Sequence, residues 1–252
     1  MKPAPFKDHF STHASGYARY RPRYPEALFA YLASLCSAHT LAWDCGTGNG
    51  QAAHGLAPHF AGIIATDASA DQIANAVPHE RITYQVAPAA QSPLASGTAD
   101  LVTVAQALHW FDLDAFYAEA HRVLKPTGVL AVWTYAALQI NLEVDAVVHR
   151  YYAEIVDRYW PPERRIVEQG YRTIPFPFDE EQPPDITLAL EWSLDDLLGY
   201  LGTWSATQRF VKMQGTNPLD QIKDALSRAW GTPLEKKQTR WPLHLRVGRR
   251  RP

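Results

Sequence analysis

The stretch LAWDCGTGNGQ, residues 41–51, decides the fold class of this 252-residue chain. A short apolar run ends at Asp44, and glycines then occupy alternate positions at Gly46, Gly48 and Gly50. A buried strand that passes directly into a glycine-rich turn is typical of sheets that bind a nucleotide-type cofactor. The spacing of the glycines distinguishes between cofactors of this kind.

A turn that binds a dinucleotide follows the pattern G-x-G-x-x-G and places the diphosphate at the N-terminus of a helix. Here the glycines lie one residue closer together, and Asp44 precedes them, where it would repel a diphosphate. An acid at this position suits a ligand that carries a positive ammonium or sulfonium group and no phosphate. The pattern therefore favours S-adenosylmethionine over NAD.

A second acid, Asp67, follows the apolar run IIAT and lies 21 positions after Gly46. Its two carboxylate oxygens are suited to accept hydrogen bonds from both hydroxyl groups of a ribose. The alternative is that Asp67 caps the following helix, although Ser69 would serve as that cap equally well. For the glycine stretch itself, the alternative is a plain tight turn.

Short apolar segments alternate with helical patterns over the first half of the chain. Strands in this arrangement, covered on both faces, predict an α/β fold with a parallel, doubly wound sheet. The last segment alternates apolar and polar residues, which predicts an antiparallel strand. We expect strands at 41–45, 61–67, 82–87, 99–107, 128–135, 186–192 and 239–249, and helices at 24–35, 141–160, 193–204 and 218–230, with a further helix beginning after Asp112.

The same patterns predict one domain over residues 1–252. Its parts are an N-terminal cover and helix (1–38), a cofactor-binding core (39–135), an insertion or lid (136–185), and C-terminal strands and helices (186–252).

The composition of the chain indicates which kinds of molecule it is expected to bind. The formal charge is −2 and 46% of residues are apolar, so the chain has a substantial core and no overall field that attracts nucleic acid or membranes. We expect Cys36 and Cys45 to be free thiols, and the absence of a signal-peptide pattern predicts a cytoplasmic protein. The histidines show no metal-binding spacing, so no metal site is expected. The C-terminal basic cluster is expected to be solvated; it comprises Arg246, Arg249, Arg250 and Arg251.

Several stretches together resemble class I S-adenosylmethionine-dependent methyltransferases, and more narrowly the trans-aconitate-methyltransferase-like group of small-molecule enzymes. The resemblance implies a Rossmann-like seven-stranded sheet of order 3-2-1-4-5-7-6, with strand 7 antiparallel, helices on both faces and a helical insertion after strand 5. The matching stretches are FSTHASGYARYRPRYPEALFAYL, WDCGTGNGQAA, TDAS, VTVAQALHWFD, RVLKPTGVLAVW, GYLGTWSA, IKDALSRAWG and RWPLHLRVGRR.

The resemblance also implies an activity, that of a transferase of EC class 2.1.1 with a small-molecule acceptor. The favoured reaction is O-methylation of a carboxylate. The alternatives are methylation of RNA or protein, a protein that binds the cofactor without catalysis, and a nicotinamide oxidoreductase, which the glycine spacing opposes. The oligomeric state is not indicated by the sequence.

Cofactor contacts carried over from the family fall on the ends of the predicted strands. Asp44, Gly46 and Gly48 would hold the methionine half of the cofactor, and Asp67 the ribose. The remaining positions are Ala90 and Gln91 near the adenine, where the family often has an acidic pair, Gln106 near the sulfonium, and Tyr17 over the carboxylate end.

The acceptor should lie beyond the strand at 99–107, because ligands of such sheets bind outside the carboxyl ends of the strands. His109 is the candidate base if the acceptor is a phenol, alcohol or amine, whereas a carboxylate needs none. Trp110 would line the site, and Arg164 of the insertion would bind an anionic acceptor. The alternatives are a packed, hydrogen-bonded His109, a core Trp110 and a solvated Arg164.

Overall fold

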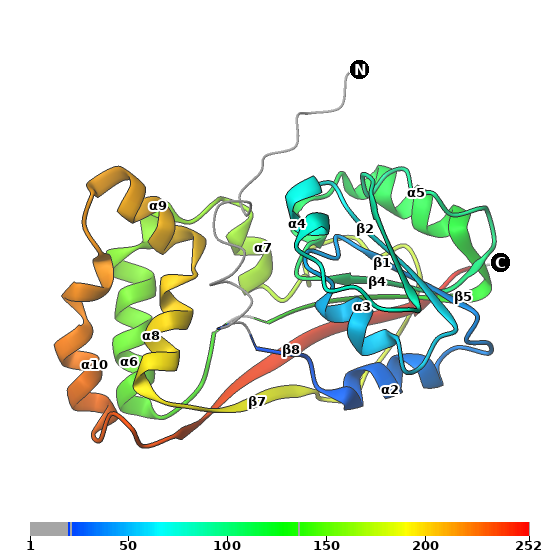
Figure 1. The fold of residues 1–252 in the computed structure, drawn as a ribbon. Coiled ribbons are helices and arrows are strands. Elements are labelled where there is room, and N and C mark those ends of the chain that lie inside the picture. The colour runs from blue at the N-terminus through cyan, green and yellow to red at the C-terminus, as the bar shows by residue number, and fades with distance from the viewer. Residues whose placement is uncertain (1–19, 21, 136, 252) are drawn as a thin grey trace.

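The computed structural model describes Tyr20, residues 22–135 and residues 137–251. Figure 1 shows a twisted sheet with helices on both faces and, beside it, a lobe made of helices. The long last strand runs from the sheet to the helical lobe, so that both parts share one element.

The parallel part of the sheet confirms the predicted α/β fold. It contains β1 (Leu41–Cys45), β2 (Gly62–Asp67), β3 (Ile82–Val86), β4 (Ala99–Ala105) and β5 (Leu124–Tyr135). These strands lie in the order β3-β2-β1-β4-β5, and all of their pairings are parallel. The carboxyl ends of the five strands therefore meet at one edge of the sheet.

The antiparallel part is built on β8 (Lys237–Arg249), which pairs with β5. β6 (Asp179–Glu181) pairs with the end of β8, and β7 (Thr187–Trp192) pairs with its beginning. The predicted order 3-2-1-4-5-7-6 is confirmed, with the sixth strand interrupted into β6 and β7.

Two apolar cores cover the faces of the sheet. One contains residues of α2 (Glu26–Ser34) and α3 (Gln51–Leu56), and the other contains residues of α5 (Leu113–Val123) and α7 (Arg164–Glu168). The first six residues of β4 are buried, as a strand covered on both faces requires. The short helix α4 (Ala70–Ala74) buries none of its residues.

The helical lobe has a third core. It is shared by α6 (Leu142–Arg150), α8 (Leu194–Gly202), α9 (Ser205–Gln214) and α10 (Lys223–Trp230). Trp241 of β8 is fully buried in this core, with its ring centroid 4.7 Å from that of Trp192. This contact fixes the lobe to the strand that extends from the sheet (Figure 1).

Some element boundaries differ from the sequence expectation. The helix expected over 141–160 is α-helical only to Arg150 and continues as a π-helical turn, Tyr151–Ile155, and a 3-10 turn, Asp157–Tyr159. The helix expected over 218–230 begins as a 3-10 turn, Pro218–Gln221, before α10. Neither α9 nor β6 was expected.

The C-terminal arginines are not free solvated charges, contrary to the sequence expectation. Arg246 forms an ion pair with Glu180 at 2.7 Å, and Arg249 forms one with Glu181 at 2.6 Å. A third ion pair, at 2.8 Å, joins Arg251, which follows β8, to Asp179 of β6. Arg250 donates to the carbonyl oxygen of Leu124. The three ion pairs thus hold β6 against β8, because they compensate for the charge repulsion among the three consecutive acids of β6.

Cys36 and Cys45 are free thiols, as predicted. Burial raises the pKa of Cys36 to about 12, so its thiolate, the reactive form, is suppressed at neutral pH. Within the described ranges, none of the helices combines the length and the apolar character that a membrane span needs.

Candidate functional site

The three glycines after β1 all have backbone angles that favour glycine. Their φ values are +69° at Gly46, +57° at Gly48 and +91° at Gly50. A Cβ atom on Gly46 would lie 2.7 Å from the Cβ of Ala107, so the loop packs directly on the segment that follows β4. At Gly48 the nearest atom would be Oε1 of Gln72, 3.8 Å away, so the surface above Gly48 has room for a ligand.

Backbone hydrogen bonds join this loop to the end of β2. The N–H groups of Gly46 and Thr47 donate to the carbonyl oxygen of Thr66 at 2.8 and 2.9 Å. The N–H of Gly48 donates to Oδ2 of Asp67 at 2.9 Å. The structure therefore brings Asp67 and the glycine loop together, as the sequence predicts.

Asp67 is not the cap of the next helix. Oδ1 of Asp67 accepts a 2.9 Å hydrogen bond from the N–H of Ser69, and the Ser69 hydroxyl accepts one from the N–H of Gln72. Ser69 is thus the N-cap of α4. This removes the alternative interpretation of Asp67 and leaves its carboxylate, partly exposed, at the edge of the sheet.

Asp44 lies beneath the loop and is fully buried. Its Oδ1 accepts a 2.8 Å hydrogen bond from the Thr103 hydroxyl, and its Oδ2 accepts one from the Thr47 hydroxyl. Burial raises the pKa of Asp44 to about 6, against hydrogen bonds from Thr47, Thr103 and the Ala53 backbone that lower it. The side chain therefore ties β1, β4 and the start of α3 together.

Gln106 follows β4 in a strained conformation, with φ at +56°. Its N–H donates to the carbonyl oxygen of Trp133 at 2.9 Å, and its Oε1 accepts a 2.8 Å hydrogen bond from the Thr134 hydroxyl. Its Nε2 is buried without a partner among the described residues. Left-handed residues other than glycine are uncommon and cluster at functional sites. Gln106 therefore offers a spare donor at the position that the sequence predicts to lie near the sulfonium.

His109 lies in a 3-10 turn, Leu108–Trp110, just after β4. Its Nδ1 is 2.8 Å from the hydroxyl oxygen of Tyr171, and its ring centroid is 4.6 Å from that of Trp110. Burial, aided by the positive charge of Arg164, lowers the pKa of His109 to about 3. The imidazole is therefore neutral at physiological pH.

Arg164, the first residue of α7, lies against two aromatic rings. Its guanidinium carbon is 4.8 Å from the ring centroid of Trp160 and 5.4 Å from that of Tyr152, and its Nε donates to the Tyr152 hydroxyl at 2.9 Å. In the part of the chain that the structure describes, the two terminal nitrogens of Arg164 make no hydrogen bond or ion pair. α7, which carries Arg164, packs against the 3-10 turn that carries His109, and the positive charge of Arg164 helps to lower the pKa of His109.

Ala90 and Gln91 form an exposed turn after β3. Their side chains make no hydrogen bond within the described ranges, so the structure does not join them to the glycine loop. Tyr17, the remaining predicted contact, lies outside the described residues.

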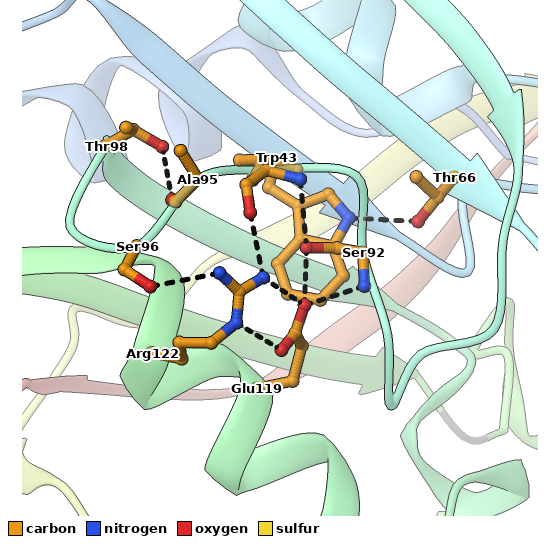
Figure 2. Close-up of polar contacts among 9 residues, drawn as sticks. Trp43, Thr66, Ser92, Ala95, Ser96, Thr98, Glu119 and Arg122 are labelled. Carbon is orange, nitrogen blue, oxygen red and sulfur yellow. Dashed lines mark hydrogen bonds and ion pairs between the residues drawn. The ribbon is translucent and has the colours of Figure 1, made fainter.

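The loop that carries this turn is anchored to α5 by the network in Figure 2. Buried Glu119 accepts hydrogen bonds from the N–H and hydroxyl of Ser92 at 2.6 and 2.7 Å and pairs with Arg122 at 2.7 Å. Arg122 also donates to the carbonyl oxygen of Leu94 at 2.8 Å. The loop after β3 is therefore fixed relative to α5 although its turn is exposed.

Two residues that the sequence did not single out also belong to the site. Tyr171 contacts His109, and the Thr134 hydroxyl contacts both Gln106 and Tyr171. The only local sequence feature at Tyr171 is the glycine that precedes it, and this feature does not indicate that Tyr171 contacts His109. Among the described residues, no three His, Cys, Asp or Glu side chains gather in a way that could hold a metal ion.

Comparisons with known proteins agree with this geometry. Residues 43–132 match the methyltransferase domain family. A protein of Dictyostelium discoideum named as a methyltransferase is 37% identical over 234 residues, which cover 91% of this chain and 89% of that one. An uncharacterized methyltransferase of Mycobacterium tuberculosis is 29% identical over 222 residues, covering 86% of this chain and 85% of its own.

Solved structures extend the likeness to the fold. A structure described as a type II methyltransferase, from Anaeromyxobacter dehalogenans, superposes with a TM-score of 0.87 and 47% identity, covering 92% of this chain and 99% of that one. A phosphoethanolamine N-methyltransferase of Haemonchus contortus, in complex with S-adenosylhomocysteine, has a TM-score of 0.52 at 16% identity, covering all of this chain and 61% of that one. The second likeness is one of fold alone.

Proposed function

This chain belongs to the class I S-adenosylmethionine-dependent methyltransferases, and we propose that it methylates a carboxylate oxygen of a small organic acid. One observation carries the choice of acceptor: the stacked guanidinium of Arg164 belongs to the helix that packs against the turn of His109, just after β4, and both of its terminal nitrogens are unoccupied by described residues. A planar guanidinium with two parallel donors matches a carboxylate, which it binds bidentately.

The residues at the edge of the sheet fit the cofactor. The backbone N–H groups of Gly48 and Ser69 hold Asp67 at the edge of the sheet, and a carboxylate there suits the hydroxyl donors of a ribose. The room above Gly48 allows a ligand to approach the backbone, and the buried Nε2 of Gln106 supplies a donor for an oxygen of a bound ligand, since a sulfonium itself accepts no hydrogen bond. When bound, S-adenosylmethionine supplies a methyl group on a sulfonium, which is a good leaving group.

The cofactor side of the site is then assigned as follows. Asp44, Gly46 and Gly48 hold the methionine half, the two glycines through their backbone and the buried Asp44 by fixing their loop. Asp67 binds the ribose, and Gln106 lies beside the sulfonium. Ala90 and Gln91 line the adenine, and Tyr17 reaches the carboxylate end of the cofactor.

On the acceptor side, the protein has to align an oxygen, the methyl carbon and the sulfur, and to exclude water. A carboxylate is already ionised at neutral pH, so no base is required. Arg164 orients the acceptor, Trp110 lines the site, and neutral His109 takes part through a hydrogen bond. This role agrees with a His109 pKa of about 3, because a group so weakly basic is a poor general base at neutral pH.

The alternatives are supported less well. A phenol, alcohol or amine acceptor would need a base, and the candidate from the sequence is the weakly basic His109. The net charge of −2 opposes RNA as the acceptor. We further propose that the protein acts in the cytoplasm, on an acid like those of the trans-aconitate-methyltransferase-like group, without binding nucleic acid or membranes.

The test is a methyl-transfer screen with isotope-labelled donor against matched panels of organic acids, phenols and amines, read by mass spectrometry. We expect labelled methyl esters, which mild alkali hydrolyses, and no product with the Asp67→Ala variant at low donor concentration. Label found only in alkali-stable N-methyl or aryl-ether products would overturn the choice of a carboxylate.

A further inference from the structure

Tyr171 lies where the insertion meets the ends of β4 and β5. It is fully buried, and its hydroxyl oxygen is 2.8 Å from Nδ1 of His109. The Thr134 hydroxyl of β5 lies beside the same phenol and donates to Gln106 at 2.8 Å. A connected set of polar side chains therefore runs from the predicted cofactor contact, Gln106, to the predicted acceptor contact, His109.

The backbone at Tyr171 is strained and held from outside. Its φ is +62°, and that of Gly170 is +60°. A bulky residue in this region costs free energy and persists only where its surroundings fix it. Here Arg246 of β8 donates to the carbonyl oxygens of Tyr171 and Ile174 at 2.9 and 2.6 Å while it pairs with Glu180. The N–H of Tyr171 also donates to the carbonyl oxygen of Ile166 in α7 at 3.1 Å, so the position of the phenol is set jointly by the end of α7 and by β8.

The contact at Nδ1 determines what His109 presents at its other nitrogen. A neutral imidazole has one donor and one acceptor nitrogen, and the partner of one nitrogen fixes the state of the other. The backbone N–H groups of Leu108 and His109 lie near the phenol oxygen and can only donate to it. Their position favours the arrangement in which the phenol gives its own proton to Nδ1. The proton of His109 then lies on Nε2, which makes no hydrogen bond with any residue that the structure describes.

We propose that Tyr171 is a positioning residue, whose hydroxyl donates to Nδ1 of His109 so that the Nε2–H group binds and orients the methyl acceptor. The inference rests on the proposed function, because it places an acceptor carboxylate beside His109. The carboxylate oxygen forms a bond with the methyl carbon as the carbon–sulfur bond breaks, with its electron pair staying on sulfur. No proton is transferred, so the pair has only to keep His109 in one tautomer and one orientation.

The first test is ¹⁵N NMR of histidine-labelled protein, assigned with His109→Gln. The wild type should show one neutral tautomer of His109, protonated at Nε2, and Tyr171→Phe should show a mixture. Tyr117→Phe is the matched control, because Tyr117 is also buried and its hydroxyl donates to the carbonyl oxygen of Pro175, not to His109. This control should leave the His109 signals unchanged. A wild-type His109 protonated at Nδ1 would overturn the proposal without any variant.

The second test is kinetic, with the best acid from the screen as acceptor. Tyr171→Phe should lower kcat by about 10- to 100-fold, as expected for a misplaced reacting group, with the affinity for S-adenosylhomocysteine unchanged. His109→Gln, whose amide reaches the position of Nε2, should retain more activity than His109→Asn. In the His109→Gln background, Tyr171→Phe should have little further effect, because its action passes through the imidazole.

These outcomes separate the two proposals. Equal, additive losses from Tyr171→Phe and His109→Gln would overturn the positioning role. A wild-type protein that methylates no acid would contradict the proposed function, and a single tautomer lost in Tyr171→Phe would still support the role of Tyr171.

Discussion

The backbone N–H of Gly48 donates a 2.9 Å hydrogen bond to Oδ2 of Asp67, which joins the loop after β1 to the acid that ends β2. Oδ1 of the same carboxylate accepts from Ser69, so each oxygen of Asp67 is already oriented by one backbone group. A ligand that binds both residues therefore meets a preformed site, and the ordering cost of binding is reduced.

The close approach at Gly46 predicts a large effect of a single methyl group. Gly46→Ala should destabilise the fold by about 3 kcal/mol, because it adds overpacking against Ala107 to an unfavourable φ. Gly97→Ala is the matched control: φ is similar at +66°, but nothing described lies within 4 Å of the added methyl group. Urea unfolding should give only about 1 kcal/mol for the control. Equal losses would show that the contact with Ala107 does not matter.

Glu119 predicts a contrast between a buried and an exposed ion pair. Burial opposes its ionisation, but hydrogen bonds from Arg122 and Ser92 outweigh this and lower the pKa of Glu119. Glu119→Gln should therefore cost about 1–3 kcal/mol at pH 7, and the difference should shrink as the pH falls through the lowered pKa. Glu154→Gln, which breaks an exposed pair with Arg150, should cost less than about 0.5 kcal/mol. Similar losses in the two variants would contradict the role given to the network in Figure 2.

Asp44 should make the free energy of unfolding depend on pH in the opposite direction to Glu119. Its pKa is raised by burial to about 6, from an ordinary value of 3.8, so the folded state binds a proton more tightly than the unfolded chain between these values. Its contribution should therefore make the free energy of unfolding fall as the pH rises from about 4 to 6. Asp44→Asn should remove this component in urea titrations compared at each pH. A pH dependence identical to that of the wild type would show that Asp44 does not titrate in this range.

Arg164 should govern the acceptor and not the cofactor. Arg164→Ala should raise KM for an acid acceptor by roughly 10- to 100-fold, the loss expected for a charged hydrogen bond, and leave the affinity for S-adenosylhomocysteine unchanged. Arg164→Lys should recover only part of this loss, because an ammonium lacks the planar fork. Arg165→Ala is the control, since its side chain is exposed on the same helix. A loss of equal size in the control would assign the effect to net charge alone.

The sequence predicted the central strands well because local patterns determine them. β1 coincides with the apolar run at 41–45, and β2, β3 and β4 begin or end within one or two residues of the predicted bounds. The elements that it missed depend on partners far along the chain. β6 is a run of three acids with no apolar pattern, and it is a strand because Arg246 and Arg249 of β8 pair with it.

The residues of the candidate site likewise differ in whether the local sequence could predict them. The glycine loop and Asp67 are adjacent to strand ends, so topology alone brings them together. Tyr171 lies 62 positions from His109, and its strained backbone is held by Arg246, a further 75 positions away. No local pattern encodes such a contact, so the sequence indicated His109 without the residue that fixes its tautomer.

Calorimetric titration with S-adenosylhomocysteine, and separately with NAD, most directly tests whether the edge formed by the glycine loop and Asp67 is a methyl-donor site. We expect the wild type to bind S-adenosylhomocysteine and not NAD. Asp67→Ala should weaken this binding by about 1.5–3 kcal/mol, the range for a hydrogen bond to a charged group. Binding of NAD without S-adenosylhomocysteine, or an Asp67→Ala variant with wild-type affinity, would contradict the assignment.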